Sequence, residues 1–374
     1  MKKRWDIFCV VVDNYGDAGV CWRLARQLAN EHGLAVRLWI DDLTPLARLC
    51  PETDIHADQQ LVAGVDVRRW SPDFPQTESA DVVVEAFACE LPQPYLAAMA
   101  ACNPRPCWIN LEYLSAESWV EGCHRMASPH GSLPLTKHFF FPGFTEKTGG
   151  LLKERDYETR RKAFDSTAFR EALNLPRPRA DELLVSLFGY ENGAVNDLLS
   201  AWAQGATPIT CLVPEGRLLP DVCNFLQVAE AKPGDRFARG ALTLQVLPFL
   251  PQDDYDRLLW LCDLNFVRGE DSFVRAQWAA KPFVWHIYLQ EEAHHRIKLQ
   301  AFLDRYVQSL APGDAAALAE FWWAWEAGSG AGAAWSSLQA VLPALTAHAR
   351  DWATDLGEHP DLAAQLVSFS LESS

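Results

Sequence analysis

The 374-residue sequence has little positive charge for its length. Lys and Arg number 33 against 49 Asp and Glu, so the formal net charge is −16. A surface this acidic repels phosphate backbones, which argues against nucleic acid as a partner. The longest basic cluster, residues 155–162, has acidic residues among its members and is typical of a solvated helix face.

Signals for secretion, membrane insertion and cysteine-based sites are also missing. The apolar run 5–12 is short and leads directly into Asp13, so it is neither a signal peptide nor a membrane span. The ten cysteines are scattered without any C-x-x-C pair, which favours reduced, buried thiols over disulfides or a zinc site. We therefore expect a cytoplasmic protein that does not bind a membrane.

What is present is a globular composition, with 49% hydrophobic and 22% charged residues. Short apolar runs alternate with helical patterns along the N-terminal half, and residues 20–32 carry an apolar helical face. The runs that we interpret as buried strands are 6–12, 36–40, 65–70, 82–87 and 108–111. Such strands between helices predict a parallel sheet covered on both faces.

A charged amphipathic helix is expected over residues 153–173, followed by a stiff linker at 176–179. This linker would end a first domain, 1–179, and open a second, 180–353. Strands of the second domain are predicted at 183–188, 209–213, 242–247, 264–267 and 283–286. The tail after Pro312 has helical periodicity, broken by a glycine-rich turn at 328–332. The fold class is therefore α/β, with two doubly wound, Rossmann-like domains whose strand ends face a shared cleft.

The first candidate site follows the first strand. Asp13 and Asp17 lie in a loop with Gly16 and Gly19, directly before a helix. Two carboxylates beside flexible glycines suit proton abstraction in a cleft. Equally, Asp17 could simply cap the helix and Asp13 end the strand. The loop lacks the glycine fingerprints of dinucleotide-binding and P-loop proteins.

The second candidate site is spread over four strand ends of the second domain. The residues concerned are Phe188, Gly189 and Tyr190; Phe249 and Gln252; Arg268, Gly269, Glu270, Asp271 and Ser272; and Tyr288 with Gln290. An arginine, a glycine and a helix N-terminus together suit a diphosphate, and the aromatic rings could sandwich a base. Alternatively, Asp271 or Ser272 caps the helix, Arg268 pairs with Glu270 and the rings are core. The coincidence at four strand ends favours a nucleotide site. Without a clustered His/Cys/Asp ligand set, we expect no metal cofactor.

Two motifs together resemble one family. Asp13-Asn-Tyr-Gly-Asp17-Ala-Gly-Val, with Trp22-Arg-Leu-Ala-Arg26 after it, and Arg268-Gly-Glu-Asp-Ser-Phe-Val-Arg-Ala-Gln277 are similar to the arginine rhamnosyltransferases of elongation factor P, the EarP family. The resemblance covers nearly the whole chain. It implies a GT-B glycosyltransferase fold, a TDP-β-L-rhamnose donor, an arginine acceptor on elongation factor P, and inversion at the anomeric carbon. It also implies a C-terminal domain that binds the nucleotide sugar, an N-terminal domain that faces the acceptor, and a terminal helix, 354–374, that crosses back.

The resemblance also implies residue roles. Asp17 would be the general base, Asp13 a supporting carboxylate, and Glu270 an essential glutamate of the donor site. The implied diphosphate contacts are Arg268, Gly269, Tyr288, Tyr190, Asp271 and Ser272, and the implied thymidine pocket is Phe188, Phe249 and Gln252.

Two other classes of function stay open at this point. A sugar-nucleotide epimerase or hydrolase of the same fold could use the same donor pocket without a protein acceptor. A binding module without catalysis would tolerate the loss of Asp17.

Overall fold

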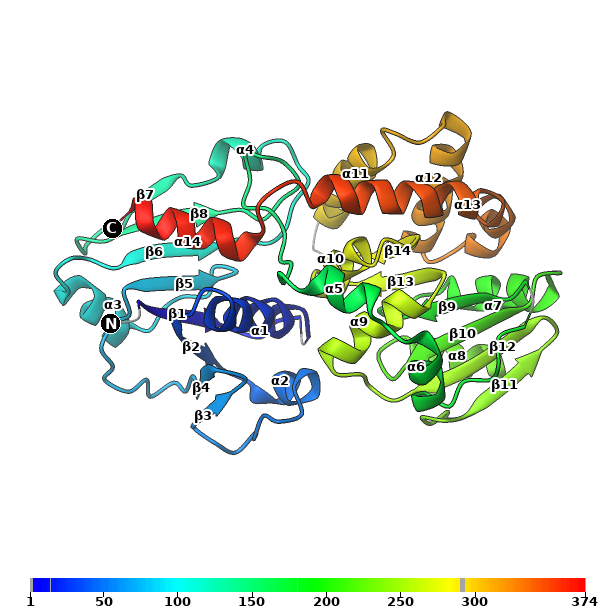
Figure 1. Cartoon of the computed structure of the whole chain (residues 1–374), viewed down its shortest axis with the longest axis horizontal. Helices are drawn as coiled ribbons and strands as arrows, with labels where there is room; N and C mark the ends of the chain where they lie inside the picture. The colour runs from blue at the N-terminus through cyan, green and yellow to red at the C-terminus, as the bar shows by residue number, and fades with distance from the viewer. Residues whose placement is uncertain (1–2, 14, 180, 290–292, 374) are drawn as a thin grey trace. The chain divides into compact units, whose positions relative to one another are not determined.

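The structure, a computed structural model, describes residues 3–13, 15–179, 181–289 and 293–373 (Figure 1). It divides into two compact units. Unit 1 comprises Met1–Arg155 and Leu356–Ser374, and unit 2 comprises Asp156–Asp355. The chain therefore leaves unit 1 once and returns to it at its C-terminal end.

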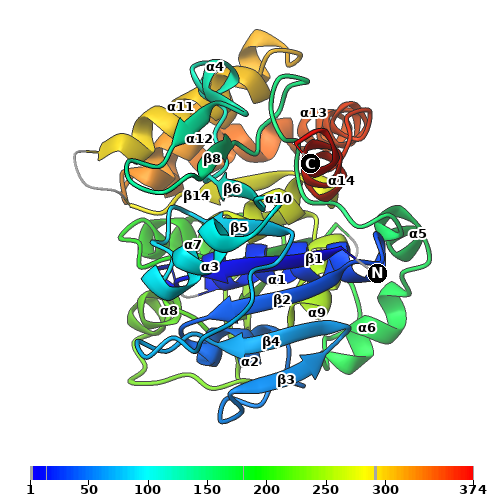
Figure 2. The ribbon, with the colours of Figure 1, turned by 90° about the vertical axis from the view of Figure 1, so that its left-hand side faces the viewer.

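The described part of unit 1 is built on an eight-stranded sheet of order β3-β4-β2-β1-β5-β6-β8-β7, and the strands from β3 to β8 can be followed from bottom to top in Figure 2. The strands are β1 (Arg4–Cys9), β2 (Ala35–Ile40), β3 (Gln59–Val62), β4 (Val65–Arg69), β5 (Val82–Ala86), β6 (Cys107–Leu111), β7 (Ala127–Pro129) and β8 (Thr136–Phe140). The interior pairs are parallel, whereas the edge pairs β3–β4 and β7–β8 are antiparallel. The carboxyl ends of β1, β2, β5 and β6 consequently meet at one edge.

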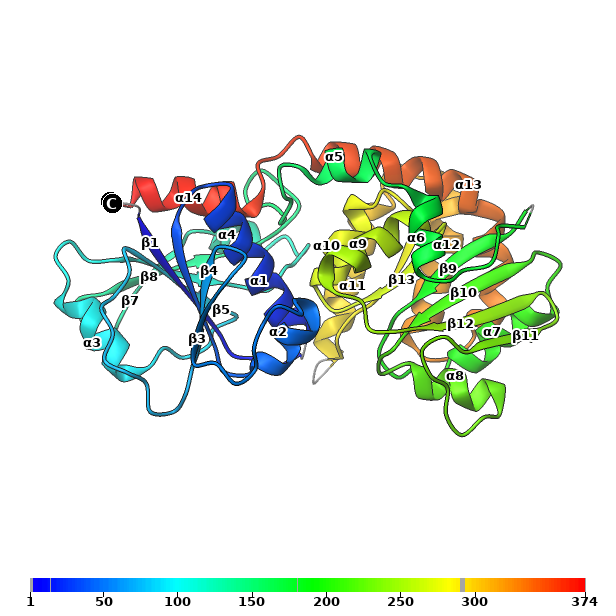
Figure 3. The ribbon, with the colours of Figure 1, turned by 60° about the horizontal axis from the view of Figure 1, so that its bottom comes forward.

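Helices cover both faces of this sheet. They are α1 (Tyr15–Asn30), α2 (Leu43–Leu49), α3 (Gln93–Ala101), α4 (Val120–Cys123) and α14 (Leu362–Glu372). Helix α1 buries the apolar stripe of Val20, Leu24 and Leu28, and it lies beside α14 in Figures 1 and 3. Helix α3 contributes Tyr95, whose ring lies 4.7 Å from that of Phe8 in β1. This contact packs α3 against the buried face of β1.

Unit 2 repeats the design with a six-stranded sheet of order β11-β12-β10-β9-β13-β14 in its described residues (Figure 3). The strands are β9 (Leu183–Leu187), β10 (Ile209–Pro214), β11 (Arg236–Arg239), β12 (Leu242–Leu247), β13 (Leu264–Arg268) and β14 (Phe283–His286). Its helices are α5 (Tyr157–Lys162), α6 (Ser166–Ala172), α7 (Val195–Gln204), α8 (Leu219–Leu226), α9 (Gln252–Leu261), α10 (Asp271–Trp278), α11 (His294–Tyr306), α12 (Pro312–Glu326) and α13 (Ala331–Leu356).

The helix expected over 153–173 is wrong in its extent. The structure has two short helices there. The first ends at Lys162 with Ala163 as its C-cap, and Asp165 caps the second by accepting the Thr167 and Ala168 backbone N–H groups. This segment packs with unit 2, where the buried Tyr157 hydroxyl accepts the Trp260 indole N–H at 2.7 Å. The unit boundary consequently lies at residues 155–156, upstream of the predicted linker at 176–179.

The second boundary, between Asp355 and Leu356, falls close to the predicted start of the terminal segment at 354. Within unit 1, α14 packs on the sheet through Phe369, whose ring lies 5.8 Å from that of Phe140. All ten cysteines are free thiols, as expected, and all are buried except Cys102 and Cys123, which are half-buried. Among the helices that the structure describes, none combines the length and hydropathy that crossing a bilayer requires.

Candidate functional site

In unit 1, Asp17 closes the loop that joins β1 to α1. The side chain is 2% exposed, and its Oδ2 atom accepts the backbone N–H groups of Val12 and Asp13, each at 2.8 Å. Its Oδ1 atom accepts the Tyr113 hydroxyl at 3.2 Å. Asp17 is the third residue of α1, and its side chain reaches back from the first helical turn to the loop.

Gly16, the second residue of α1, lies close to Asp13. A Cβ atom added to Gly16 would lie 2.9 Å from Oδ2 of the half-buried Asp13, and the Gly16 N–H donates to the Asp13 carbonyl at 2.7 Å. A further carboxylate, Asp41 at the end of β2, accepts the Val11 N–H at 2.9 Å. The structure thus brings the two predicted aspartates together at the carboxyl end of β1.

Tyr113 was not predicted as a site residue. It follows β6 and stacks on Phe87, which follows β5, with ring centroids 4.3 Å apart and an interplanar angle of 14°. Phe87 and Ala88 both have φ of 56°, a left-handed conformation that costs energy for residues with a Cβ and often occurs at functional sites. A single tyrosine after a strand gives no distinctive sequence signal, so only the fold identifies it.

In unit 2, Arg268 ends β13 between two aromatic rings. Its guanidinium carbon lies 4.8 Å from the centroid of Phe188 and 4.7 Å from that of Tyr190, both of which follow β9. The side chain is 5% exposed. Cation–π contacts of this kind hold a guanidinium in place while its N–H groups can bind an anion.

The start of α10 lies beside Arg268. The Ser272 hydroxyl bonds both the N–H and the carbonyl of Arg268, so it anchors the strand end and does not cap the helix. Gly269 has φ of 61° and its carbonyl accepts the Trp285 indole N–H at 2.7 Å. Glu270 is the N-cap residue without a side-chain cap hydrogen bond.

The remaining predicted residues surround this point. Gln252, the first residue of α9, donates to Asp271 Oδ2 at 3.2 Å, and Phe249 lies half-buried just before it. Tyr288 follows β14 and its ring lies 5.6 Å from that of Tyr190. The predicted Gln290, like Asn14 of the first loop, lies outside the described residues.

Two buried polar residues of this site were missed. Tyr255 in α9 has its ring 5.3 Å from that of Phe188, and burial raises the pKa of its hydroxyl. His286 accepts the Tyr190 N–H on Nδ1 at 3.3 Å, and burial, reinforced by Arg268, lowers its pKa to about 4. His286 is therefore a neutral acceptor near pH 7. His286 lies inside an apolar run, where the sequence indicates only core, and Tyr255 lies among charged residues of a helix, where the sequence gives no signal of a site.

The second half of the motif that begins at Arg268 packs in the core of unit 2 and supports the fold. Phe273 stacks on Trp285 at 3.8 Å, and Gln277 accepts the Trp352 indole N–H at 2.9 Å. Arg275 forms a fully buried ion pair with Asp256, with Nη2 and Oδ2 2.7 Å apart. Within the described ranges, no three His, Cys, Asp or Glu side chains are grouped so as to hold a metal ion.

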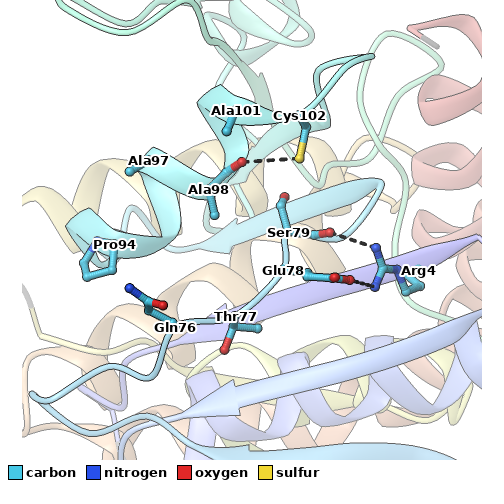
Figure 4. A pocket seen from close by; sticks show the side chains of 10 residues that line it. All are labelled: Arg4, Gln76, Thr77, Glu78, Ser79, Pro94, Ala97, Ala98, Ala101 and Cys102. Atoms are coloured by element: carbon cyan, nitrogen blue, oxygen red, sulfur yellow. Dashed lines mark hydrogen bonds and ion pairs between the residues drawn. The ribbon is translucent and has the colours of Figure 1, made fainter.

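A hollow of about 710 Å³ lies apart from both sites, along α3 (Figure 4). Small side chains of α3, such as Ala97 and Ala101, line one side. On the other side the Arg4 guanidinium bonds the Glu78 carboxylate and the Ser79 carbonyl, each at 3.2 Å. Its lining includes none of the predicted site residues, so it is not part of the candidate site.

Comparison with known proteins decides the family. The model of the family described as "Elongation-Factor P (EF-P) rhamnosyltransferase EarP" matches residues 5–371. The chain belongs to the EarP family. A protein-arginine rhamnosyltransferase of Pseudomonas aeruginosa is 52% identical to this EarP chain over 370 residues, which cover 98% of each protein. As an EarP member, the chain is a protein-arginine rhamnosyltransferase, an enzyme of the glycosyltransferase class.

Solved structures agree with the EarP assignment. A structure that gives the "structural basis for EarP-mediated arginine glycosylation of translation elongation factor EF-P" matches all of both chains with a TM-score of 0.72 and 38% identity. A glycosyltransferase of kitacinnamycin matches 99% of both chains with a TM-score of 0.53 and 12% identity, which shows the fold alone. The two Rossmann-like units are therefore those of the GT-B glycosyltransferase fold, as predicted.

Proposed function

We propose that this protein transfers rhamnose from TDP-β-L-rhamnose to an arginine side chain of elongation factor P in the cytoplasm, with inversion at the anomeric carbon. Family membership supplies the reaction class. The observation that carries the choice of donor is the position of Arg268, held between Phe188 and Tyr190 beside the start of α10. A cation, two rings and a helix N-terminus match a nucleoside diphosphate.

The donor site is proposed to stabilise the leaving group. When the bond between the anomeric carbon and the diphosphate oxygen breaks, negative charge develops on TDP. Arg268 and the first N–H groups of α10 offset this charge from fixed positions, so the transition state needs no metal ion. Phe188, Phe249 and Gln252 are proposed to hold the thymidine, while Tyr190, Gly269, Asp271, Ser272 and Tyr288 border the diphosphate and sugar. Glu270 is proposed to orient the donor.

The acceptor presents a different difficulty, because a protonated guanidinium is a poor nucleophile. Asp17 is proposed to accept a proton from the acceptor guanidinium as the new C–N bond forms, while the C–O bond to TDP breaks on the opposite face. The support is that backbone N–H groups fix one oxygen of Asp17 and the Tyr113 hydroxyl contacts the other. Asp13 is proposed to add negative charge that favours the cationic acceptor.

Intact-mass spectrometry of elongation factor P tests this function. Incubation with the protein and TDP-rhamnose should add one deoxyhexose to the acceptor, with the same yield in excess EDTA. Omission of the acceptor should leave the donor intact, whereas an epimerase or hydrolase would consume it at an undiminished rate. An unchanged acceptor mass would refute the proposed transfer. Activity lost to EDTA and restored by Mg²⁺ would refute only the metal-free step.

A further inference from the structure

One strand end of unit 2 has no part in the site described so far. The proposed donor residues follow β12, β9, β13 and β14, but the sheet order places β10 between β12 and β9. Because the strands are parallel here, the carboxyl end of β10 lies between two parts of the donor site. That end continues into the loop of residues 215–218, before α8.

The loop after β10 contacts the rings of the donor site. A Cβ atom added to Gly216 would lie 3.3 Å from the Phe188 ring, so the backbone packs closely on that ring. The next residue, Arg217, places its guanidinium carbon 5.6 Å from the centroid of Tyr190, whose ring also contacts Arg268 at 4.7 Å. Two guanidinium groups therefore lie over one aromatic ring.

Arg217 is paired with Glu191, the residue after Tyr190. Its Nε atom donates to Glu191 Oε1 at 3.0 Å, and the two side chains are 47% and 54% exposed. Partial burial works to raise the pKa of Glu191, but Arg217, and more weakly Arg268, lower it below its usual value. The carboxylate thus stays ionised near both arginines, and so exposed a pair is weak enough to exchange.

We infer that Arg217 is a second diphosphate-binding guanidinium of the donor site, and that Glu191 is its exchangeable counter-ion. The inference rests on the proposed binding of TDP in unit 2. Arg217 releases the Glu191 carboxylate and bonds a phosphate oxygen of the nucleoside diphosphate, while its contact with Tyr190 keeps it over the site. Glu191 then competes with the ligand, and the two residues together set the affinity and its dependence on phosphate.

Calorimetric titration of the full chain with TDP and with thymidine separates the parts of this inference. Arg217→Ala should weaken TDP binding roughly 3- to 30-fold, the range for one exposed charge-assisted contact, and leave thymidine binding unchanged. Glu191→Gln should strengthen TDP binding about 2- to 5-fold, and this gain should disappear in the Arg217→Ala background. Arg257→Ala is the matched control. Arg257 is 51% exposed, and its guanidinium lies 2.7 Å from the Asp254 carboxylate. This ion pair is away from the rings of the donor site. It should bind TDP like the wild type.

Three results would overturn the inference. If Arg217→Ala binds TDP within twofold of the wild type, Arg217 does not contact the phosphate. An equal loss for thymidine and TDP would show that Arg217 only supports Tyr190. If Glu191→Gln binds TDP as well as or more weakly than the wild type, Glu191 does not compete with the ligand for Arg217. A wild-type protein that binds no TDP would instead refute the donor site of the proposed function itself.

Discussion

Asp17 uses its two carboxylate oxygens differently. One accepts two backbone N–H groups of its own loop, and the other contacts the hydroxyl of Tyr113, a residue of another strand end. The sequence left a choice between a structural cap and a base. The geometry makes these roles compatible, because a carboxylate that is fixed by the backbone is also oriented for proton transfer.

Replacement of Asp17 by Asn should separate the two roles. The Asn amide oxygen can still accept the Val12 and Asp13 N–H groups, so we expect the loop to persist. The amide cannot accept a proton, so transfer should fall about 10²- to 10⁴-fold in a discontinuous mass assay. Asp41→Asn is the control, because Asp41 also accepts a loop N–H but has no proposed catalytic role. Transfer by Asp17→Asn within threefold of the wild type would contradict the base assignment.

The residues that the sequence could locate are those at the ends of apolar runs. Arg268 and Tyr190 were found because their strands are strongly apolar and stop at polar or glycine-containing segments. Arg217 was not found, because its place beside the donor site depends on β10 lying between β12 and β9. The apolar residues of a strand do not indicate which strands it pairs with. Tyr113 was missed for a similar reason, because its partner Asp17 lies 96 residues away.

At the scale of elements, α10 has two functions on two faces. Its first residues border the proposed donor site, while Arg275 points into the core and pairs with Asp256 of α9. Both side chains are fully buried, and the Arg275 guanidinium also lies 4.4 Å from the centroid of the Tyr157 ring. The ion pair therefore fixes α10 against α9 and, through it, the helix start that borders Arg268.

Breaking this pair on one side should destabilise the protein strongly. Asp256→Ala leaves the Arg275 charge buried without its carboxylate, which typically costs about 3–5 kcal/mol. Urea unfolding followed by tryptophan fluorescence measures the loss. The double variant Asp256→Leu with Arg275→Met, which removes both charges, should recover much of it. A single variant within about 1 kcal/mol of the wild type would show that the pair does not hold α10.

The element pattern explains which parts of the fold were predictable. Interior strands such as β5 and β10 are continuously buried and therefore appear as apolar runs. The antiparallel edge strands β3, β7 and β11 were missed, because they are short and partly exposed and so lack a strong period. The segment 153–173 was predicted as one helix because an aspartate inside a charged amphipathic pattern looks like any other surface residue. In the structure Asp165 has an extended backbone and acts as the N-cap of a second helix.

For the whole molecule, the buried His286 makes stability depend on pH. Its pKa is about 4 in the folded protein, against an ordinary value near 6.5. The unfolded chain therefore binds more protons between these values, and stability falls as the pH drops from about 6.5 towards 4. At pH 5 the loss is of order 2 kcal/mol, since one pKa unit corresponds to about 1.4 kcal/mol.

Urea unfolding at pH 7.5 and pH 5 tests this contribution. His286→Gln has no titrating ring but can still accept the Tyr190 N–H, so its stability should fall less between the two pH values than that of the wild type. Other groups that titrate in this range affect both proteins alike and cancel in the comparison. The same fall in both proteins would mean that His286 does not titrate on unfolding.

The last prediction concerns the division of work between the units, since Asp17 belongs to unit 1 and Arg268 to unit 2. Arg268→Ala should weaken TDP binding about 10- to 150-fold, because a lost charge-assisted contact is worth roughly 1.5–3 kcal/mol. Asp17→Asn should bind TDP like the wild type and fail only in transfer. Glu270→Gln should lower turnover through a misplaced donor, because a carboxylate beside a diphosphate repels it unless it bonds a hydroxyl or an N–H group. Loss of TDP binding in Asp17→Asn, with binding retained in Arg268→Ala, would move the donor site to unit 1.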